Sequence, residues 1–185
     1  MPRQVLFVQG GGEGAHDHWD NKLVESLERN LGPDYEIRYP HMPREGDPQY
    51  MRWKTALERE LAKLDTGAIL VGHSIGAAIL ITVLAEETLA RSPGGIFMIS
   101  APFVGLGGWP SDDIQPMSNI GARLPTNMAA YLYHGSEDKS VPFEHVGLYE
   151  KAIPQAIVCR LAGRDHQLNN DLSDVAADIR QCAKS

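Results

Sequence analysis

The chain has 185 residues, which suits a single domain and leaves little length for a second one. Hydrophobic residues make up 43% and charged residues 22%, an ordinary globular composition that excludes collagen-like, disordered and disulfide-scaffold proteins. The formal net charge is -7 and lysine and arginine form no cluster, so we expect neither nucleic acid nor a membrane surface as a partner.

No segment of the sequence resembles an export signal or a membrane span. The first apolar run, residues 5–8, is too short for a signal peptide, and no run approaches the roughly 18 apolar residues of a transmembrane helix. The two cysteines, Cys159 and Cys182, lack the C-x-x-C spacing of zinc and redox sites. We therefore expect a cytoplasmic protein with reduced thiols and without a metal or another cofactor.

Short β-rich runs alternate with helical patterns from one end of the chain to the other. The six runs expected to form strands are nearly continuous apolar stretches, at residues 5–9, 35–39, 68–72, 96–100, 130–134 and 156–161. Such strands are typical of a parallel sheet that helices cover on both faces. The alternation predicts an α/β fold, a three-layer α/β/α sandwich around a mostly parallel six-stranded sheet.

Five helices are expected between and after these strands. The first carries an apolar residue at every fourth position: Trp19, Leu23, Leu27 and Leu31. The second begins at Asp47-Pro48, where an N-cap precedes a first-turn proline. The third follows Ser74 and is apolar nearly all round, which predicts a buried helix. Residues 143–153 and 172–182 complete the set.

One segment interrupts this alternation. Residues 101–128 follow the fourth expected strand, are rich in glycine and proline, and carry Phe103 and Trp109. Long loops in small domains are usually functional, so we expect Phe103 and Trp109 to line a substrate pocket. The alternative is a loop that only covers the core. In either case the chain is too short for a large cap domain.

The segment Gly72-His73-Ser74-Ile75-Gly76 matches the pattern G-x-S-x-G. An expected strand leads directly into it and the apolar helix leads directly out, which is the setting of a nucleophile elbow. In that turn only glycine fits on either side of the nucleophile, and a strained backbone holds the serine hydroxyl above the sheet. We therefore interpret Ser74 as a nucleophile rather than as the N-cap of a glycine-rich turn.

A serine hydroxyl is a weak nucleophile until a base takes its proton. In hydrolases with this elbow, the chain order is serine, then an acid, then histidine. Here the fifth strand is followed by Glu137-Asp138 and the sixth by His166, so both loops join Ser74 at the carboxyl edge of the sheet. We interpret His166 as general acid and base and Asp138 as its orienting carboxylate, with Glu137 as the alternative acid.

The glycine-rich loop after the first strand, residues 10–14, has a second expected role. Attack on an acyl carbon places negative charge on the carbonyl oxygen, which needs preorganised N–H donors. We expect one donor at the backbone of Ile75 and the other at Gly11 or Gly12. Glycine at these positions allows the backbone to approach the substrate closely.

The early loops allow two other interpretations. Gly10-x-Gly12-x-x-Ala15 fits a dinucleotide fingerprint, but the second strand lacks the closing acidic residue and Glu13 would repel a pyrophosphate. His16-Asp17-His18 resembles a metal clip, but histidines in an unconstrained loop are more often solvated. We therefore expect neither a nucleotide nor a metal.

These residues resemble the α/β-hydrolase superfamily and, more narrowly, its small serine hydrolases of the retinoblastoma-binding-protein-nine type. The matching segments span nearly the whole chain: the early glycine loop, His18-Trp19, Met42-Pro43, Pro48, Trp53, Gly72-His73-Ser74, Gly135-Ser136-Glu137-Asp138 and Val141-Pro142. The resemblance implies a minimal fold without the superfamily's first two strands, a Ser74, Asp138 and His166 triad, and ester hydrolysis. The sequence departs from it at two places: Gln9 stands where many members carry a histidine before the first glycine, and Arg164-Asp165 precede His166 where a plain glycine–histidine pair is common.

We therefore expect one domain over residues 1–185 that acts as a metal-independent serine hydrolase. Its expected partner is a small-molecule acyl ester or thioester, cleaved through an acyl-enzyme intermediate. Two alternatives remain: an acyltransferase, and a non-catalytic or regulatory binding protein that retains the hydrolase fold.

Overall fold

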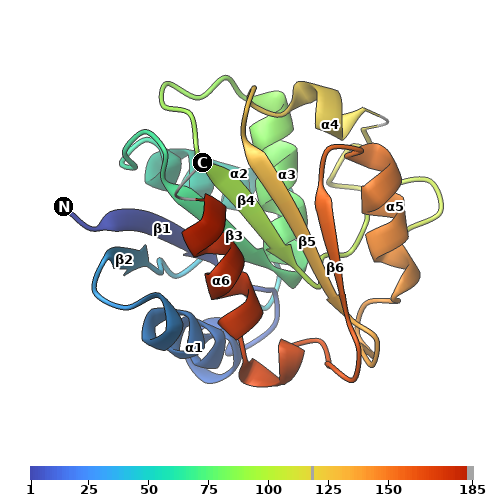
Figure 1. Ribbon diagram of the computed structural model, residues 1–185. Coiled ribbons are helices and arrows are strands. Elements are labelled where there is room, and N and C mark those ends of the chain that lie inside the picture. Colours follow the sequence, from blue (N-terminus) through green and yellow to red (C-terminus); the bar gives the residue numbers. More distant parts are fainter. Residues whose placement is uncertain (118, 183–185) are drawn as a thin grey trace.

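The computed structural model describes residues 1–117 and 119–182 (Figure 1). Its centre is one six-stranded sheet in which all neighbouring strands are parallel, in the order β2-β1-β3-β4-β5-β6. The predicted α/β class and the six-stranded sheet are confirmed, and the sheet is wholly rather than mostly parallel. The strands are β1 (Arg3–Val8), β2 (Tyr35–Arg38), β3 (Ile69–His73), β4 (Gly95–Ile99), β5 (Ala129–Gly135) and β6 (Ile157–Leu161).

Helices cover both faces of this sheet and complete the three layers (Figure 1). One face carries α1 (Asn21–Leu31) and α6 (Ser173–Cys182). The other carries α2 (Tyr50–Leu61), α3 (Ser74–Glu86), α4 (Ile120–Arg123) and α5 (Glu144–Ala152). Two short turns, the π-helical η1 (Ala15–Asp20) and the 3-10 helix η2 (Leu168–Asn170), precede α1 and α6. Within the described residues no large cap domain is inserted, and no helix is long and apolar enough to cross a membrane.

The apolar side chains of the strands contribute to two separate hydrophobic cores, one on each face of the sheet. In β1, Val5 and Phe7 pack on the α1 and α6 side, whereas Leu6 and Val8 pack on the α2 and α3 side. All four side chains are fully buried. Since successive side chains of a strand point to opposite faces, a strand covered on both sides needs an apolar residue at every position. This requirement explains why the sequence shows runs instead of alternation.

Helix α3 is central, as its all-round apolar sequence predicts. Residues 76–85 are all buried, and most of their side chains belong to the larger of the two cores. The helix begins at Ser74, directly after β3. The turn between a buried strand and a buried helix therefore fixes the position of this serine.

The predicted four-residue stripe of the first helix is wrong at its first member. Leu23, Leu27 and Leu31 are at most 5% exposed, whereas Trp19 is 56% exposed. Trp19 belongs to η1, in which the N–H of Asn21 bonds the carbonyl of His16, five residues earlier. A π-helical turn holds more residues than an α-helical turn, so it rotates Trp19 away from the face that the three leucines share.

The segment after β4 packs partly into the core. Phe103, Ile114 and Ile120 are buried on the side of α3 and α5, and Val104 forms an isolated bridge with Trp109. Burial of these apolar side chains against the two helices stabilises the fold, because it removes apolar surface from water. The first part of the segment is therefore a folded cover on α3 and α5.

Candidate active site

Ser74 lies in a strained turn that both neighbouring glycines make possible. Its φ is 52°, in the left-handed region that L-residues rarely adopt. A Cβ on Gly76 would lie 1.9 Å from the carbonyl oxygen of Gln9, and one on Gly72 would lie 2.6 Å from Cα of Ala77. Both distances are far inside van der Waals contact, so the G-x-S-x-G spacing is a steric requirement of this turn.

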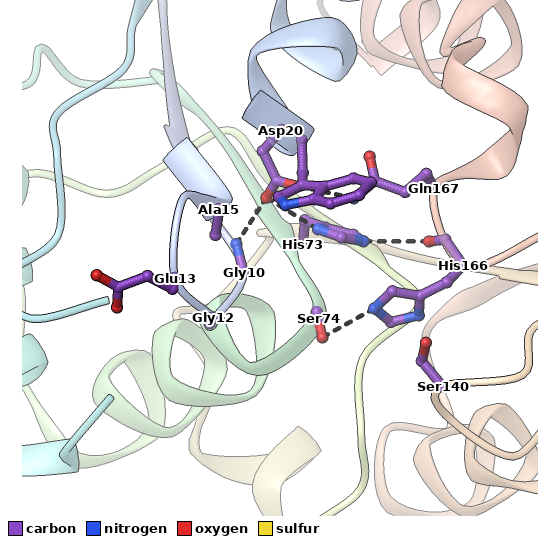
Figure 2. Close-up of a pocket in the computed structure, with 12 residues that line it drawn as sticks. Gly10, Gly12, Glu13, Ala15, Asp20, His73, Ser74, Ser140, His166 and Gln167 are labelled. Carbon is purple, nitrogen blue, oxygen red and sulfur yellow. Dashed lines mark hydrogen bonds and ion pairs between the residues drawn. The ribbon is translucent and has the colours of Figure 1, made fainter. Parts of the chain in front are cut away.

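Three side chains from three loops form a hydrogen-bonded row. The Oγ of Ser74 lies 3.1 Å from Nε2 of His166, and Nδ1 of His166 lies 2.8 Å from Oδ2 of Asp138. Figure 2 shows the His166 ring turned toward Ser74. The loops follow β3, β5 and β6, so they meet at the carboxyl edge of the sheet, where α/β folds gather their sites. The structure thus brings together the three residues that the sequence analysis singled out.

Asp138 accepts hydrogen bonds on both of its oxygens. Its Oδ1 accepts from the backbone N–H groups of Ser140 and Val141, at 2.8 and 2.9 Å. Its Oδ2 accepts from His166 and also lies 3.2 Å from Nε2 of His134. Burial alone would raise the pKa of Asp138, but the bonds from His134, His166 and Val141 outweigh it and hold the pKa far below its usual range. The carboxylate therefore stays ionised and fixed.

The alternative acid, Glu137, lies outside this arrangement. It is exposed, and its backbone N–H bonds the carbonyl of Arg164 at 2.9 Å. No described residue links its carboxylate to His166. The geometry thus favours Asp138, which the sequence could not separate from its neighbour by chain order alone.

The glycine loop lies against the elbow. A Cβ on Gly11 would lie 2.9 Å from Cγ2 of Ile75 and 2.8 Å from Cγ of Pro48, so only glycine fits there. The N–H of Gly12 donates to the carbonyl of Glu45 at 2.7 Å and is therefore already engaged. Among the described residues, the N–H of Gly11 has no such partner. Of the two expected donors in this loop, the geometry favours Gly11 over Gly12.

Two residues to which the sequence analysis assigned no role, Gln9 and Glu45, hold the glycine loop in place through hydrogen bonds. Gln9 is fully buried; its Oε1 accepts from the N–H of Met42 at 2.9 Å, and its Nε2 donates to the Glu45 carboxylate. That carboxylate also accepts from the N–H groups of Gly14 and His16, at 2.8 and 2.9 Å. Gln9 thus links the loop to the segment around Met42, at the position where many superfamily members carry histidine.

A cavity of about 330 Å³ opens beside Ser74 (Figure 2). Its lining comes from the glycine loop, η1, the elbow and the two loops that follow β5 and β6: Gly10, Gly11, Gly12, Glu13, Ala15, Trp19, Asp20, His73, Ser74, Ser140, His166 and Gln167. Trp19, exposed by the π-helical turn, is the one large aromatic side chain among these residues. The sequence pattern did not predict this position of Trp19, because the indole matched the spacing of a core stripe.

Phe103 and Trp109 lie elsewhere. Phe103 is 9% exposed; its N–H donates to Nδ1 of His145 at 2.8 Å, and its ring packs edge-on against Tyr149. Trp109 is 40% exposed and packs edge-on against His145. Neither is among the residues that line the cavity beside Ser74. The structure therefore corrects the expectation that these two residues form the wall of that cavity.

A second histidine and carboxylate pair, which the sequence analysis did not predict, lies directly beside the row. His73 and Asp20 are 2% and 1% exposed, and Nδ1 of His73 lies 2.9 Å from Oδ2 of Asp20. Burial alone would disfavour both charges, but their mutual attraction and hydrogen bond outweigh it. The pKa of His73 is raised and that of Asp20 is lowered.

The early histidines do not form the clip considered from the sequence. Among the described residues, the ligand atoms of His16, Asp17 and His41 lie within 4.8 Å of one another, without His18. Nδ1 of His16 already contacts Asp17 at 2.6 Å, and its Nε2 lies 3.2 Å from the carbonyl oxygen of Tyr39. Since both ring nitrogens of His16 have protein partners, the geometry does not single out this group as a metal site.

Solved structures share the fold at low sequence identity. The ydeN gene product from B. subtilis has a TM-score of 0.82 at 19% identity, over 99% of this chain and 100% of that chain. The esterase domain of a Rhodothermus marinus protein has a TM-score of 0.63 at 21% identity, over 97% of this chain and 84% of that chain. XC6422 from Xanthomonas campestris is described as an α/β serine hydrolase without a lid. It has a TM-score of 0.66 at 18% identity, over 99% of this chain and 81% of that chain.

Sequence comparisons identify the family. No curated protein matches the chain significantly. A family model described as serine hydrolase matches residues 5–163, a range that holds the glycine loop, the elbow and Asp138 and ends shortly before His166. The fold is that of the α/β-hydrolase superfamily, and the chain belongs to the serine hydrolase family.

Proposed function

We propose that the protein hydrolyses small acyl esters or thioesters through an acyl-enzyme intermediate. Ser74 is the nucleophile, His166 the general acid and base, and Asp138 the carboxylate that orients His166. The observation that carries this proposal is the hydrogen-bonded row of the three side chains beside a cavity. The same constellation activates serine for acyl transfer on several unrelated folds.

Acylation begins when Nε2 of His166 accepts the Ser74 proton while Oγ bonds the acyl carbon. The electron pair displaced from the carbonyl bond moves to its oxygen, where the N–H groups of Ile75 and Gly11 stabilise the charge. The intermediate then collapses, the bond to the leaving group breaks, and His166 gives its proton to the departing oxygen or sulfur. Asp138 keeps Nδ1 of His166 protonated throughout.

Deacylation repeats these steps with water in place of the serine. His166 takes a proton from water, the water oxygen bonds the acyl carbon, and the proton returns to Oγ of Ser74 as the acid leaves. An added alcohol or amine that entered in place of water would yield a new ester or amide. Analysis of the products with and without such an acceptor therefore separates hydrolysis from acyl transfer.

The comparisons add support for an ester as substrate, because one of the similar structures is described as an esterase domain. The narrower placement among hydrolases of the retinoblastoma-binding-protein-nine type rests on the segment with Met42-Pro43, Pro48 and Trp53, and His18-Trp19 is a further point of resemblance. Two of these segments meet the site, since Trp19 lines the cavity and Met42 bonds the side chain behind the glycine loop.

The test is turnover of a p-nitrophenyl ester together with labelling by a fluorophosphonate probe. Ser74→Ala should lower turnover by about a thousandfold or more and abolish labelling, because the nucleophile is gone. Ser92→Ala, which changes an exposed serine before β4, should leave both unchanged. Full activity in Ser74→Ala would remove Ser74 from the mechanism, and an unlabelled, inactive wild type would favour a binding protein instead.

A further inference from the structure

The His73 and Asp20 pair is a buried feature of the site that the proposed mechanism does not use. The His73 ring lies next to the His166 ring, with 4.8 Å between ring centroids. His73 is the residue before the nucleophile, and Asp20 is the last residue of η1. A buried ion pair this close to a nucleophile and its base needs a reason, because two desolvated charges are costly to keep.

The partners of His73 determine its protonation state. Nδ1 faces Oδ2 of the Asp20 carboxylate at 2.9 Å, and Nε2 faces the main-chain carbonyl oxygen of His166 at 3.1 Å (Figure 2). A carbonyl oxygen and an ionised carboxylate can only accept hydrogen bonds. Both ring nitrogens must therefore donate, and an imidazole that donates from both nitrogens is the cationic form.

Asp20 connects this cation to two other loops. Its Oδ2 also accepts from the N–H of Gly10 at 2.6 Å, and its Oδ1 accepts from Nε2 of Gln167 at 3.1 Å. The pair thus bonds the glycine loop through Gly10, the elbow through His73 itself, and the loop of the base through His166 and Gln167. These are the three segments whose relative placement sets the distance between Ser74 and His166.

We propose that Asp20 and the imidazolium form of His73 are positioning residues, a buried ion pair that holds the main chain of His166 and Gly10 in the geometry that acyl transfer requires. This inference rests on the proposed function for its kinetic consequence. The protonation state of His73 does not depend on it.

A neutral pair could not make the same set of bonds. Neutral imidazole has one N–H, so either the bond to Asp20 or the bond to the His166 carbonyl would be lost. An amide in place of Asp20 could still accept from Gly10, and its NH₂ group could face Gln167, whose Oε1 has no partner within the described residues. Asp20→Asn therefore removes the charge while its shape and its other bonds can be kept.

The charged groups around His73 favour the cation on balance. Asp20 lies in contact on the side of η1, and Asp138, on the loop after β5, also raises the pKa of His73. Burial acts in the opposite direction. The His166 ring, the other titratable group in contact, is neutral in the resting row if its Nε2 is to accept the Ser74 proton.

The first test is the ¹⁵N spectrum of the histidine rings in the wild-type protein. At about pH 7, where an unperturbed imidazole is mostly neutral, both ring nitrogens of His73 should give protonated-type signals. A His73→Gln variant assigns them by their loss. A neutral His73 at this pH would overturn the proposal, whether or not the protein cleaves esters.

The second test is the kinetics of Asp20→Asn. We expect kcat for a p-nitrophenyl ester to fall about 10- to 100-fold, the cost of a base displaced by a fraction of an ångström to one ångström, while KM changes by less than about twofold. The His73 signals should become those of a neutral ring. A purely structural role would instead lower thermal stability and leave kcat of the folded fraction unchanged, which would overturn the proposal.

Asp17→Asn is the matched control. Asp17 lies in the same turn, η1, and contacts His16 at 2.6 Å, but its side chain is 65% exposed. The variant removes the same charge from the same kind of pair, away from His166. It should keep kcat, KM and the His73 signals of the wild type. A wild type that fails to cleave any ester would contradict the proposed function, and the spectrum of His73 would still decide the protonation state.

Discussion

Asp138 illustrates how few atoms decide the chemistry of this site. Its Oδ1 accepts from two backbone N–H groups, and its Oδ2 accepts from the ring of His166 and also contacts the ring of His134. Both carboxylate oxygens therefore have fixed partners. His134 is buried, and its Nε2 lies 3.1 Å from the carbonyl oxygen of Val141 as well. The carboxylate is thus oriented by the loop that carries it before any substrate binds.

Asp138→Asn should keep the fold and lower kcat by about 10⁴, because an amide NH₂ group toward Nδ1 favours the wrong tautomer of His166. Steady-state kinetics on a p-nitrophenyl ester measures this effect. Glu137→Gln changes the exposed neighbouring acid and should have no effect. If Glu137→Gln carried the large loss instead, the assignment of Asp138 would be wrong.

Trp19 is the one large aromatic side chain among the described residues that line the cavity, so we expect it to distinguish substrates. Trp19→Ala should raise KM for aromatic esters and lower kcat/KM about tenfold, because an aromatic contact contributes about 0.5–1.5 kcal/mol beyond its area. For a small acetyl ester of an aliphatic alcohol the change should be smaller. Trp109→Ala is the matched control, since Trp109 is 40% exposed but does not line this cavity. A larger effect of Trp109→Ala than of Trp19→Ala would restore residues 101–128 as the pocket wall.

At the scale of elements, the β3-elbow-α3 unit could be predicted from sequence because its pattern is local. An apolar run, two glycines around Ser74 and an all-apolar helix follow one another in the sequence, and this combination indicates a nucleophile elbow. The π-helical turn η1 could not be predicted, because one extra residue in a turn leaves no mark on composition. The pair of Asp20 and His73 was not predicted for another reason: its members are 53 residues apart, Asp20 lies in no motif, and His73 occupies a variable position of the elbow.

The elbow makes a prediction at this scale. Gly76→Ala should destabilise the fold by about 2–4 kcal/mol or prevent folding, since the new Cβ would overlap the carbonyl oxygen of Gln9 and two backbones would have to separate. Gly147→Ala is the control: this glycine lies inside α5 with nothing within 4 Å, so alanine should stabilise the helix by up to about 1 kcal/mol. Urea denaturation followed by circular dichroism compares the two. Equal stability of both variants would contradict the steric account of the elbow.

At the scale of the whole molecule, the alternation of strands and helices predicted the parallel sheet and its two covered faces. The lining of the cavity was not predictable, because it depends on how a long segment folds back. Phe103 is apolar enough to line a pocket or to enter the core, and only the position of α5 decides between these places.

Stability should fall on acidification. Asp20 and Asp138 have pKa values below those of unfolded aspartate, so between about pH 5 and the folded pKa values the unfolded chain binds more protons. The free energy of unfolding should then decrease by up to about 1.4 kcal/mol per carboxylate for each pH unit lost. The raised pKa of His73 affects stability at higher pH. It stabilises the fold fully below the pKa of unfolded histidine, about 6.5, and this stabilisation is lost as the pH rises through the pKa of His73 in the folded protein. Urea midpoints at pH 5 and pH 3 measure the acid limb, and Asp20→Asn should flatten it. Equal midpoints for the wild type would contradict the depressed pKa values.

The proposed nucleophile, Ser74, and the proposed base, His166, belong to parts of the fold with different cooperativity. Ser74 begins a helix whose residues 76–85 are all buried, so displacing Ser74 from its turn requires disruption of the core around α3. His166 lies on a surface loop that closes through a few hydrogen bonds, and such loops open at low free-energy cost while the core stays intact. As the denaturant concentration rises, we therefore expect hydrolysis to be lost before secondary structure is lost. Ser74 then still lies in its native turn after His166 has moved out of hydrogen-bond distance.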